Sequence, residues 1–212
     1  MKKRYIQLPK EYISYSQLAQ WQRDPEQYKA IYFDNRDELR TSNVAMEYGK
    51  VVADALEHGI QTGDLLTDAA MLMLPKYDVA DQEMRVDMKV PKAGWVELLA
   101  KPDSFNSLTK DFYEYKTGKQ PWTAKKAQDH LQLHFYALAI YLKYHVIPAC
   151  SLIWIETEQS GTGIAPTGRV EEFPVLFSLS SILTTMSLVS RVARKIEIAY
   201  AAHVPNKALL EY

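Results

Sequence analysis

The residues best suited to chemistry lie between positions 101 and 136. Asp103 follows Pro102, and the run EYKTGK over 114–119 supplies Glu114 and Lys116. Residues two apart on a strand share a face, so Glu114 and Lys116 should lie side by side, and a hairpin of this length could place Asp103 beside them. Two carboxylates and a lysine suit Mg²⁺, which takes one or two carboxylates, phosphate oxygens and water. The pattern therefore indicates metal chemistry on a phosphate group, with the lysine orienting water or offsetting charge.

Amide and aromatic groups follow on the next expected helix. Gln132 and Tyr136 are one helical turn apart, and Gln128 lies one turn earlier, so all three should share a face. This stripe could contact a nucleic-acid backbone, orient the lysine or pack in the core. The backbone carbonyl of Tyr115 is one more oxygen that could bind metal.

A short basic segment lies beside the same cluster. Positions 116–126 hold four lysines and no acid, with one tryptophan among them (Lys116, Lys119, Lys125, Lys126 and Trp122). Such a run is either a solvated face or a surface that guides phosphates, where the tryptophan could stack on a base.

These residues resemble the PD-(D/E)XK nuclease superfamily. Pro102-Asp103 followed by Glu114-Tyr115-Lys116 matches its central pattern. The TGK extension and Gln132-x-x-x-Tyr136 are similar to the RecB-like and CRISPR-associated exonuclease branch, as is the entry segment SYSQL over 14–18 with Pro25 and Tyr28. Glu83 stands where this branch often has an acid on its first core strand. The similarity covers about residues 12–157.

Two departures from the branch bear on the metal centre. Its members usually carry a metal-binding histidine four residues after a helix glycine. Here the residue four positions after Gly49 is Ala53. Glu57 could substitute, with Asp54, Glu47 and His58 as weaker alternatives. Several relatives also hold a four-cysteine iron–sulfur cluster, which a chain with the single cysteine Cys150 cannot build.

The resemblance implies a Mg²⁺- or Mn²⁺-dependent deoxyribonuclease with a restriction-endonuclease-like α/β (α+β) core. The metal would be held by Asp103, Glu114, the carbonyl of Tyr115 and Glu57. Lys116 would position the nucleophile or stabilise the transition state. Gln132 and Tyr136 would support the lysine or the DNA backbone. The expected activity is an exonuclease of recombination, repair or phage DNA metabolism, acting on single- or double-stranded DNA with a recombinase or single-strand-binding protein as partner. The alternatives are a structure-selective endonuclease and a non-catalytic DNA-binding or assembly module.

The elements that must position these residues follow from periodicity and caps. Helices are expected from Ser14 or Ser16 to Trp21, after Asp24-Pro25, and over about 43–59 and 65–74. Alternation predicts strands over 83–90, 95–101 and 111–116, and then one helix runs from the cap Thr123 to about Tyr144. Strands at 150–157 and 169–175, separated by a loop over 159–168, precede a helix over about 180–202.

This order predicts a central mixed sheet flanked by helices. We expect a single domain over 1–212, with a helical part at 1–78, the catalytic sheet and helix at 79–177, and a C-terminal helix at 178–212.

Composition narrows the classes of function. The 212 residues carry 25 basic and 26 acidic side chains, a net charge of −1, which excludes a protein that coats nucleic acid by bulk charge. Hydrophobic residues make up 47%, as in a globular protein. Neither a signal peptide nor a membrane span is evident, so a cytoplasmic location, in a bacterial or phage-infected cell, is expected.

Overall fold

The computed structural model describes residues 3–40, 47–52, 55, 62, 65–80, 82–160 and 163–210, without the side chains of 66, 70, 160 and 205–210. Its first elements are strand β1 (Tyr12–Ser14), helix α1 (Tyr15–Arg23) and helix α2 (Pro25–Tyr32). Ser14 caps α1 by accepting from the Gln17 amide at 3.4 Å, and Asp24 caps α2 by accepting from the Gln27 amide at 2.9 Å. Both helices were expected, whereas β1 lies in the part expected to be helical.

Shorter elements follow α2. A 3₁₀ turn, η1 (Asp37–Leu39), comes next, and residues 47–52 are helical as expected. Helix α4 (Leu65–Leu72) ends before Pro75. The remainder of the helix expected over 43–59 lies outside the described residues, apart from Ala55, which is helical.

The strands form two mixed sheets. One has the order β1-β4-β3, in which β3 (Met84–Val90) and β4 (Gly94–Ala100) make an antiparallel hairpin and β1 joins β4 in parallel. The other has the order β2-β5-β6-β7-β8. Its strands are β2 (Val79–Ala80), β5 (Ser104–Phe105), β6 (Phe112–Gly118), β7 (Ala149–Ser160) and β8 (Gly163–Leu176).

The expectation of one central sheet is therefore corrected to two. The chain leaves β4 at Ala100 and begins β5 at Ser104, so residues 101–103 interrupt what would be one long strand. Pro102 sits in this break and has no amide proton to donate to a ladder. Asp103 thereby lies at the junction of the two sheets. The architecture, two mixed sheets flanked by helices, is that of a restriction-endonuclease-like α/β fold.

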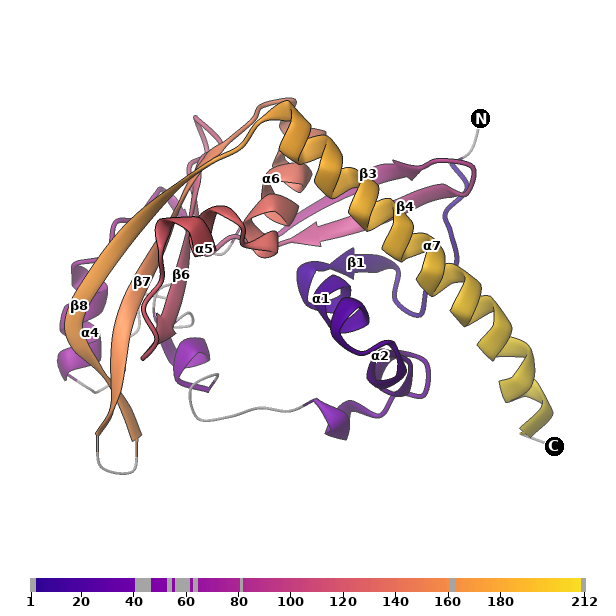
Figure 1. Ribbon diagram of the computed structural model, residues 1–212, viewed down its shortest axis with the longest axis horizontal. Coiled ribbons are helices and arrows are strands. Elements are labelled where there is room, and N and C mark those ends of the chain that lie inside the picture. The colour runs from indigo at the N-terminus through magenta and orange to yellow at the C-terminus, as the bar shows by residue number, and fades with distance from the viewer. Residues whose placement is uncertain are drawn as a thin grey trace.

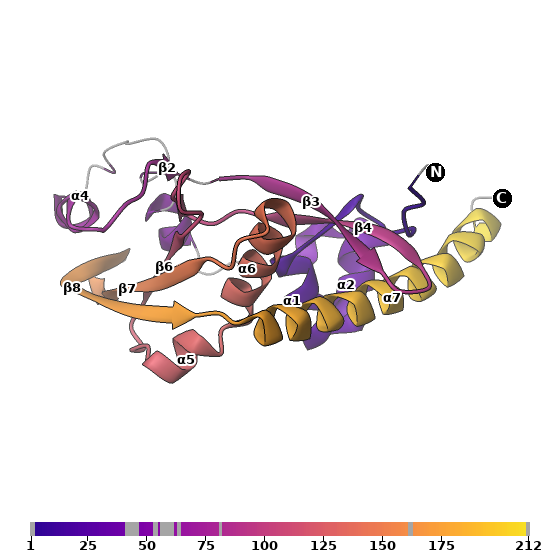
Figure 2. The ribbon, with the colours of Figure 1, turned by 90° about the horizontal axis from the view of Figure 1, so that it is seen from above.

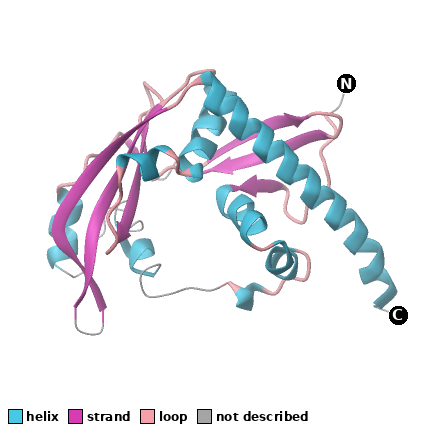
Figure 3. Cartoon of the chain, in the orientation of Figure 1, coloured by secondary structure: helices cyan, strands magenta, loops and turns pink. Residues whose placement is uncertain are grey.

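A long antiparallel hairpin replaces the loop expected over 159–168. β7 and β8 pair from Ala149↔Leu176 to Ser160↔Gly163 (Figure 3). Pro166 and Gly168 suggested a loop, but β8 lies at the edge of its sheet, where a proline without an amide proton is tolerated.

The helix expected from Thr123 to Tyr144 is also two helices. Thr123 caps α5 (Ala124–Gln128), which ends at Asp129, and His130 precedes α6 (Leu131–Tyr144) in an extended conformation with φ −75° and ψ 109°. α6 lies between the two sheets (Figures 1 and 2). The middle turns of α6 carry apolar side chains on nearly every side, which explains why the helix is buried.

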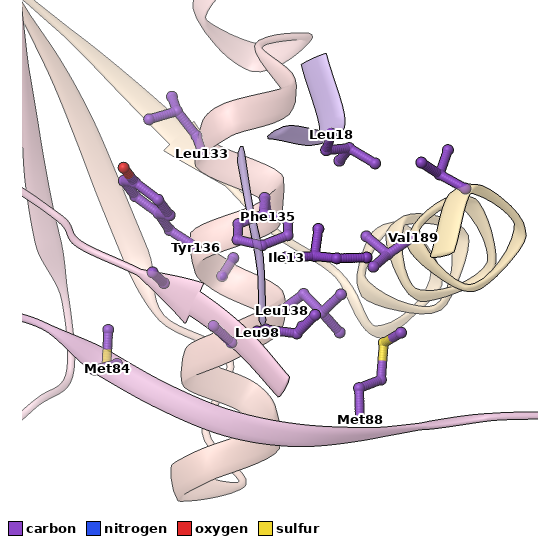
Figure 4. Packing of buried hydrophobic residues seen from close by; sticks show 14 of the residues in the cluster. Ile13, Leu18, Met84, Met88, Leu98, Leu133, Phe135, Tyr136, Leu138 and Val189 are labelled. Carbon is purple, nitrogen blue, oxygen red and sulfur yellow. The ribbon is translucent and has the colours of Figure 1, made fainter. Parts of the chain in front are cut away.

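The last helix, α7 (Leu179–Leu210), starts beside the end of β8 and crosses α6, α1 and β3 (Figure 2). One apolar cluster joins these elements; Figure 4 shows Ile13, Leu18, Met88, Leu98, Leu138 and Val189 within it. A second cluster covers the opposite face of β6 and β7, where Val52 and Met71 pack with Tyr115, Ile153 and Ile155. Among the described helices, none is long and apolar enough to cross a membrane.

Candidate functional site

A closed hydrogen-bond network joins β6 to α6. The ammonium of Lys116 donates to Glu114 Oε1 at 2.7 Å and to Gln132 Oε1 at 2.9 Å. The amide of Gln132 donates to the same Glu114 oxygen at 2.5 Å and to the hydroxyl of Tyr136 at 2.9 Å. Four of the residues singled out in the sequence are thus in mutual contact.

The local structure explains this arrangement. Even-numbered residues of β6 face α6, so Glu114 and Lys116 share that face with the buried Phe112, as the strand period predicts. Gln132 and Tyr136 are one turn apart on α6 and lie on the side that meets the strand. Glu114 is only 1% exposed, so its carboxylate is held in place by the lysine and the amide rather than by water.

Asp103 approaches the same strand from the break between β4 and β5. Its Oδ2 accepts from the backbone amide of Tyr115 at 2.8 Å, which places this carboxylate between the positions of Glu114 and Lys116 along β6. The hairpin therefore brings Asp103 to the cluster, as the sequence suggests. The Tyr115 ring points to the opposite face, where its hydroxyl donates to the Pro75 carbonyl at 2.7 Å.

The two carboxylates determine the charge state of Lys116. Burial favours the neutral amine, but the charges of Glu114 and Asp103 and the hydrogen bond to Glu114 outweigh it and raise the pKa of Lys116 above its ordinary value. Lys116 is therefore a cation at neutral pH. It can donate to a phosphate oxygen or a water.

The side chains around Lys116 meet the requirements of a divalent cation in part. The described residues contain no group of three or more His, Cys, Asp or Glu side chains placed to hold a metal. Asp103 and Glu114 could supply the one or two carboxylates that Mg²⁺ takes, with substrate and water completing its shell. The oxygen-only chemistry of this pair fits Mg²⁺ or Mn²⁺.

Of the other carboxylates proposed as metal ligands, some lie outside the described residues and two are bound to basic side chains. Glu57, like Ala53, Asp54 and His58, lies outside the described residues. Glu83 is exposed before β3 and accepts from Arg85 at 3.1 Å. Glu47 accepts from Lys50 at 2.9 Å.

The basic segment is only partly as expected. Lys119, Lys125 and Lys126 are exposed, and the Lys126 ammonium lies 4.1 Å from the centre of the Trp122 ring. Gln128 differs, because its amide donates to the Leu176 carbonyl at 2.9 Å and accepts from the Leu176 amide at 3.2 Å. The break before α6 removes Gln128 from the helix that carries Gln132. Its expected place on the Gln132 and Tyr136 face is therefore wrong.

Two residues that sequence reasoning did not select also lie near Lys116. Burial raises the pKa of Tyr15 although the charge of Lys116 opposes this, whereas burial and the charge of Lys116 together lower the pKa of His130 to about 4. Their rings are 6.1 Å apart, and His130 meets Trp122 edge-on at 5.1 Å. The signal in the sequence was that Tyr15 lies within the entry segment SYSQL and that His130 is two residues before Gln132.

Comparison with known proteins supports the fold. No protein-family model and no curated protein matches the sequence. Among solved structures, a putative exonuclease from Eubacterium rectale is similar with a TM-score of 0.58 and 12% identity, over 91% of this chain and 82% of that chain. A protein named SSO0001 aligns at a TM-score of 0.39 and 12% identity, over 86% and 75% of the two chains, a likeness too weak to bear on fold or function.

Proposed function

We propose that the protein is a nuclease that hydrolyses DNA phosphodiester bonds with Mg²⁺ or Mn²⁺. The observation that carries the proposal is the arrangement of Lys116, which is bound to Glu114 and Gln132 and lies next to the Asp103 carboxylate on the Tyr115 amide. A fixed cation beside two carboxylates suits metal-assisted attack on a phosphate. The fold shared with the putative exonuclease from Eubacterium rectale supports the same class.

Each residue has a role in this proposal. Asp103 and Glu114 hold the metal, with the Tyr115 carbonyl and Glu57 as further oxygen donors. The metal, when bound, polarises the phosphate and lowers the pKa of a bound water. Lys116 orients the attacking water or neutralises charge on the phosphate, and Gln132 fixes the lysine and Glu114 relative to each other. Tyr136 steadies the Gln132 amide.

The kind of nuclease and its setting belong to the same proposal. We propose an exonuclease of recombination, repair or phage DNA metabolism, acting in the cytoplasm with a recombinase or single-strand-binding protein as partner. The exposed Lys119, Lys125 and Lys126 with Trp122 would meet the DNA backbone at one side of the site.

The direct test is cleavage of end-labelled single- and double-stranded DNA with Mg²⁺, Mn²⁺ or EDTA. Lys116→Met and Asp103→Asn should each lower cleavage by about 100-fold or more, because each removes an electrostatic element of the site. Lys89→Met, an exposed lysine on the other sheet, is the matched control and should cleave like the parent.

The products identify the kind of nuclease. Progressive loss of label from one end supports an exonuclease, whereas cutting of circular DNA would indicate an endonuclease. DNA binding without cleavage under any metal would leave a non-catalytic module and overturn the enzymatic proposal.

A further inference from the structure

A groove of about 800 Å³ lies over the N-terminal helices. Side chains from α1, α2, η1 and the helical segment 47–52 line it. Its described lining contains three cations and no acid; the cations are Arg23, Arg40 and Lys50. The groove is therefore positively charged although the whole chain is nearly neutral, and a positive groove favours an anionic ligand.

The acids near these cations are outside the lining and exposed to solvent. Arg40 pairs with Asp37 at 2.8 Å and Lys50 with Glu47 at 2.9 Å, and in both pairs the side chains are about half or more exposed. Exposed pairs contribute about 0–1 kcal/mol and exchange readily. Both cations can therefore turn to a phosphate at little cost. Arg23 donates to the neutral amide of Gln20, which leaves its charge available to an anion.

The groove also offers aromatic and amide groups. Tyr15 and Tyr32 line it, and the Arg40 guanidinium lies 4.7 Å from the centre of the Tyr32 ring while donating to its hydroxyl at 3.1 Å. Gln20 and Gln27 are hydrogen-bonded to each other at 2.8 Å along the same wall. A positively charged groove with a partly exposed aromatic ring, here Tyr15, suits single-stranded nucleic acid, because every base has a face that can stack.

Tyr15 connects this groove to the candidate site, since its ring lies 6.1 Å from that of His130. Tyr15 lines the groove and also feels the charges of Lys116 and Glu114. Gly49, next to Lys50, lies so close to the end of β6 that a Cβ at this position would be 3.4 Å from the Thr117 hydroxyl. Thr117, like Tyr115, is an odd-numbered residue of β6, so this approach packs the helical segment on the face opposite Lys116, and Tyr15 is the residue that connects the groove to the Lys116 cluster.

A larger groove of about 900 Å³ lies on the face of β3 and β4 and serves as a comparison. Its charges are balanced: Asp87 is bound by Lys3 and Tyr5, and Arg85 pairs with Glu97. Among the described residues that line it, there is neither an excess of unpaired cations nor a link to Lys116.

We propose that the groove of Arg23, Arg40 and Lys50 holds the DNA strand whose phosphodiester lies at Lys116. This inference rests on the proposed function and adds the path of the strand. Phosphates would pair with the three cations, and a base would stack on Tyr15 as the strand enters the site.

The test is binding of a fluorescent single-stranded oligonucleotide in EDTA, so that no cleavage occurs. The double variant Arg23→Glu with Lys50→Glu should bind at least tenfold more weakly. In a plot of log affinity against log salt concentration, its slope should be shallower by about 0.7 for each phosphate that is no longer neutralised. The control is Lys29→Glu with Arg36→Glu, which makes the same charge change outside the groove and should bind within about twofold of the parent. Thermal unfolding confirms that both variants are folded.

The outcomes separate this proposal from the nuclease assignment. Equal affinity of the groove variant and the control would overturn the strand path even if the parent cleaves DNA. Weaker binding by the groove variant, with a parent that cleaves nothing, would keep the groove and overturn the nuclease. If polyglutamate displaces the oligonucleotide at the same charge concentration, the groove is a site for acidic peptides and the proposal fails.

Discussion

Lys116 keeps its positive charge in a largely enclosed position because two carboxylates surround it. Gln132 connects that cation to Glu114, with one end of its amide accepting from the lysine and the other donating to the carboxylate. A side chain that fits both partners at once fixes their separation. In the proposed nuclease this makes Gln132 a positioning residue rather than a catalytic one.

Gln132→Leu should therefore lower DNA cleavage by about 10- to 100-fold and raise the metal concentration needed for half-maximal activity. The leucine keeps the volume but neither hydrogen bond. Tyr136→Phe, which removes only the hydroxyl that Gln132 donates to, should have a smaller effect. A Gln132→Leu variant with the metal dependence of the parent would contradict this role.

His130 should make the protein sensitive to mild acid. Burial and the nearby Lys116 and Lys126 lower its pKa to about 4 in the folded state, whereas the unfolded chain titrates near the ordinary value of 6.5. Between these values the unfolded chain binds the proton more readily, so stability should fall as the pH drops from 6.5 toward 4.

Urea unfolding at pH 7.5 and 5 checks this sign. The parent should lose more stability between the two values than the His130→Asn variant does. Equal losses would mean that His130 is exposed to solvent and titrates normally.

At the scale of residues, the sequence predicted the cluster of Glu114, Lys116, Gln132 and Tyr136 because short-range spacing within one strand and one helix determines which of them share a face. Glu114 and Lys116 are two apart on a strand, and Gln132 and Tyr136 are four apart on a helix. Tyr15 and His130 could not be selected, because their place beside Lys116 depends on how α1 and the turn before α6 pack, which no local period encodes.

The helices and strands also divide into those that local sequence patterns predict and those that depend on packing. The hairpin of β3 and β4, strand β6 and the capped helices have local patterns and were expected. β1 and β2 have three and two residues and pair only with partners distant in the chain, such as Ile13 opposite Leu98, and β5 has only two residues to carry a pattern. The break between α5 and α6 is equally a product of packing, since β8 holds Gln128 by its amide.

Gln128→Ala should show that this amide is structural. Removing both hydrogen bonds to Leu176 should lower the free energy of unfolding by about 1–3 kcal/mol. DNA affinity in EDTA should stay within about twofold of the parent, because the amide faces β8. Lys125→Ala, an exposed neighbour on α5, is the control for stability. A drop in affinity without a drop in stability would restore the predicted contact of Gln128 with nucleic acid.

For the whole molecule, we propose that the chain over 1–212 is one domain. A single apolar cluster draws on α1, α2, both sheets, α6 and α7, which supports cooperative unfolding of all these parts. The expected helical part at 1–78 would then not be a separate unit, since Ile13 and Leu18 are fully buried in the shared core.

The variant Leu138→Ala tests whether the chain unfolds as one domain. The side chain is fully buried in α6 between the sheets, so its truncation should lower the free energy of unfolding by about 2–5 kcal/mol. Tryptophan fluorescence, which follows the buried Trp154, and far-ultraviolet circular dichroism should report the same midpoint. Leu183→Ala, half-exposed on α7, should change stability by less than about 1 kcal/mol. Two separate transitions would show that the parts unfold independently.

The course of α7 has a consequence for how the protein is made. The apolar surface of α1 and β3 is covered by Val189, Val192 and Ile196, which leave the ribosome long after the strands they cover. Until then, a nascent chain presents that surface to its surroundings, and contacts this distant in sequence close slowly. Synthesis of this protein should therefore depend on chaperones that bind exposed apolar segments, and a ribosome stalled before residue 189 should carry a chain that digests readily with protease.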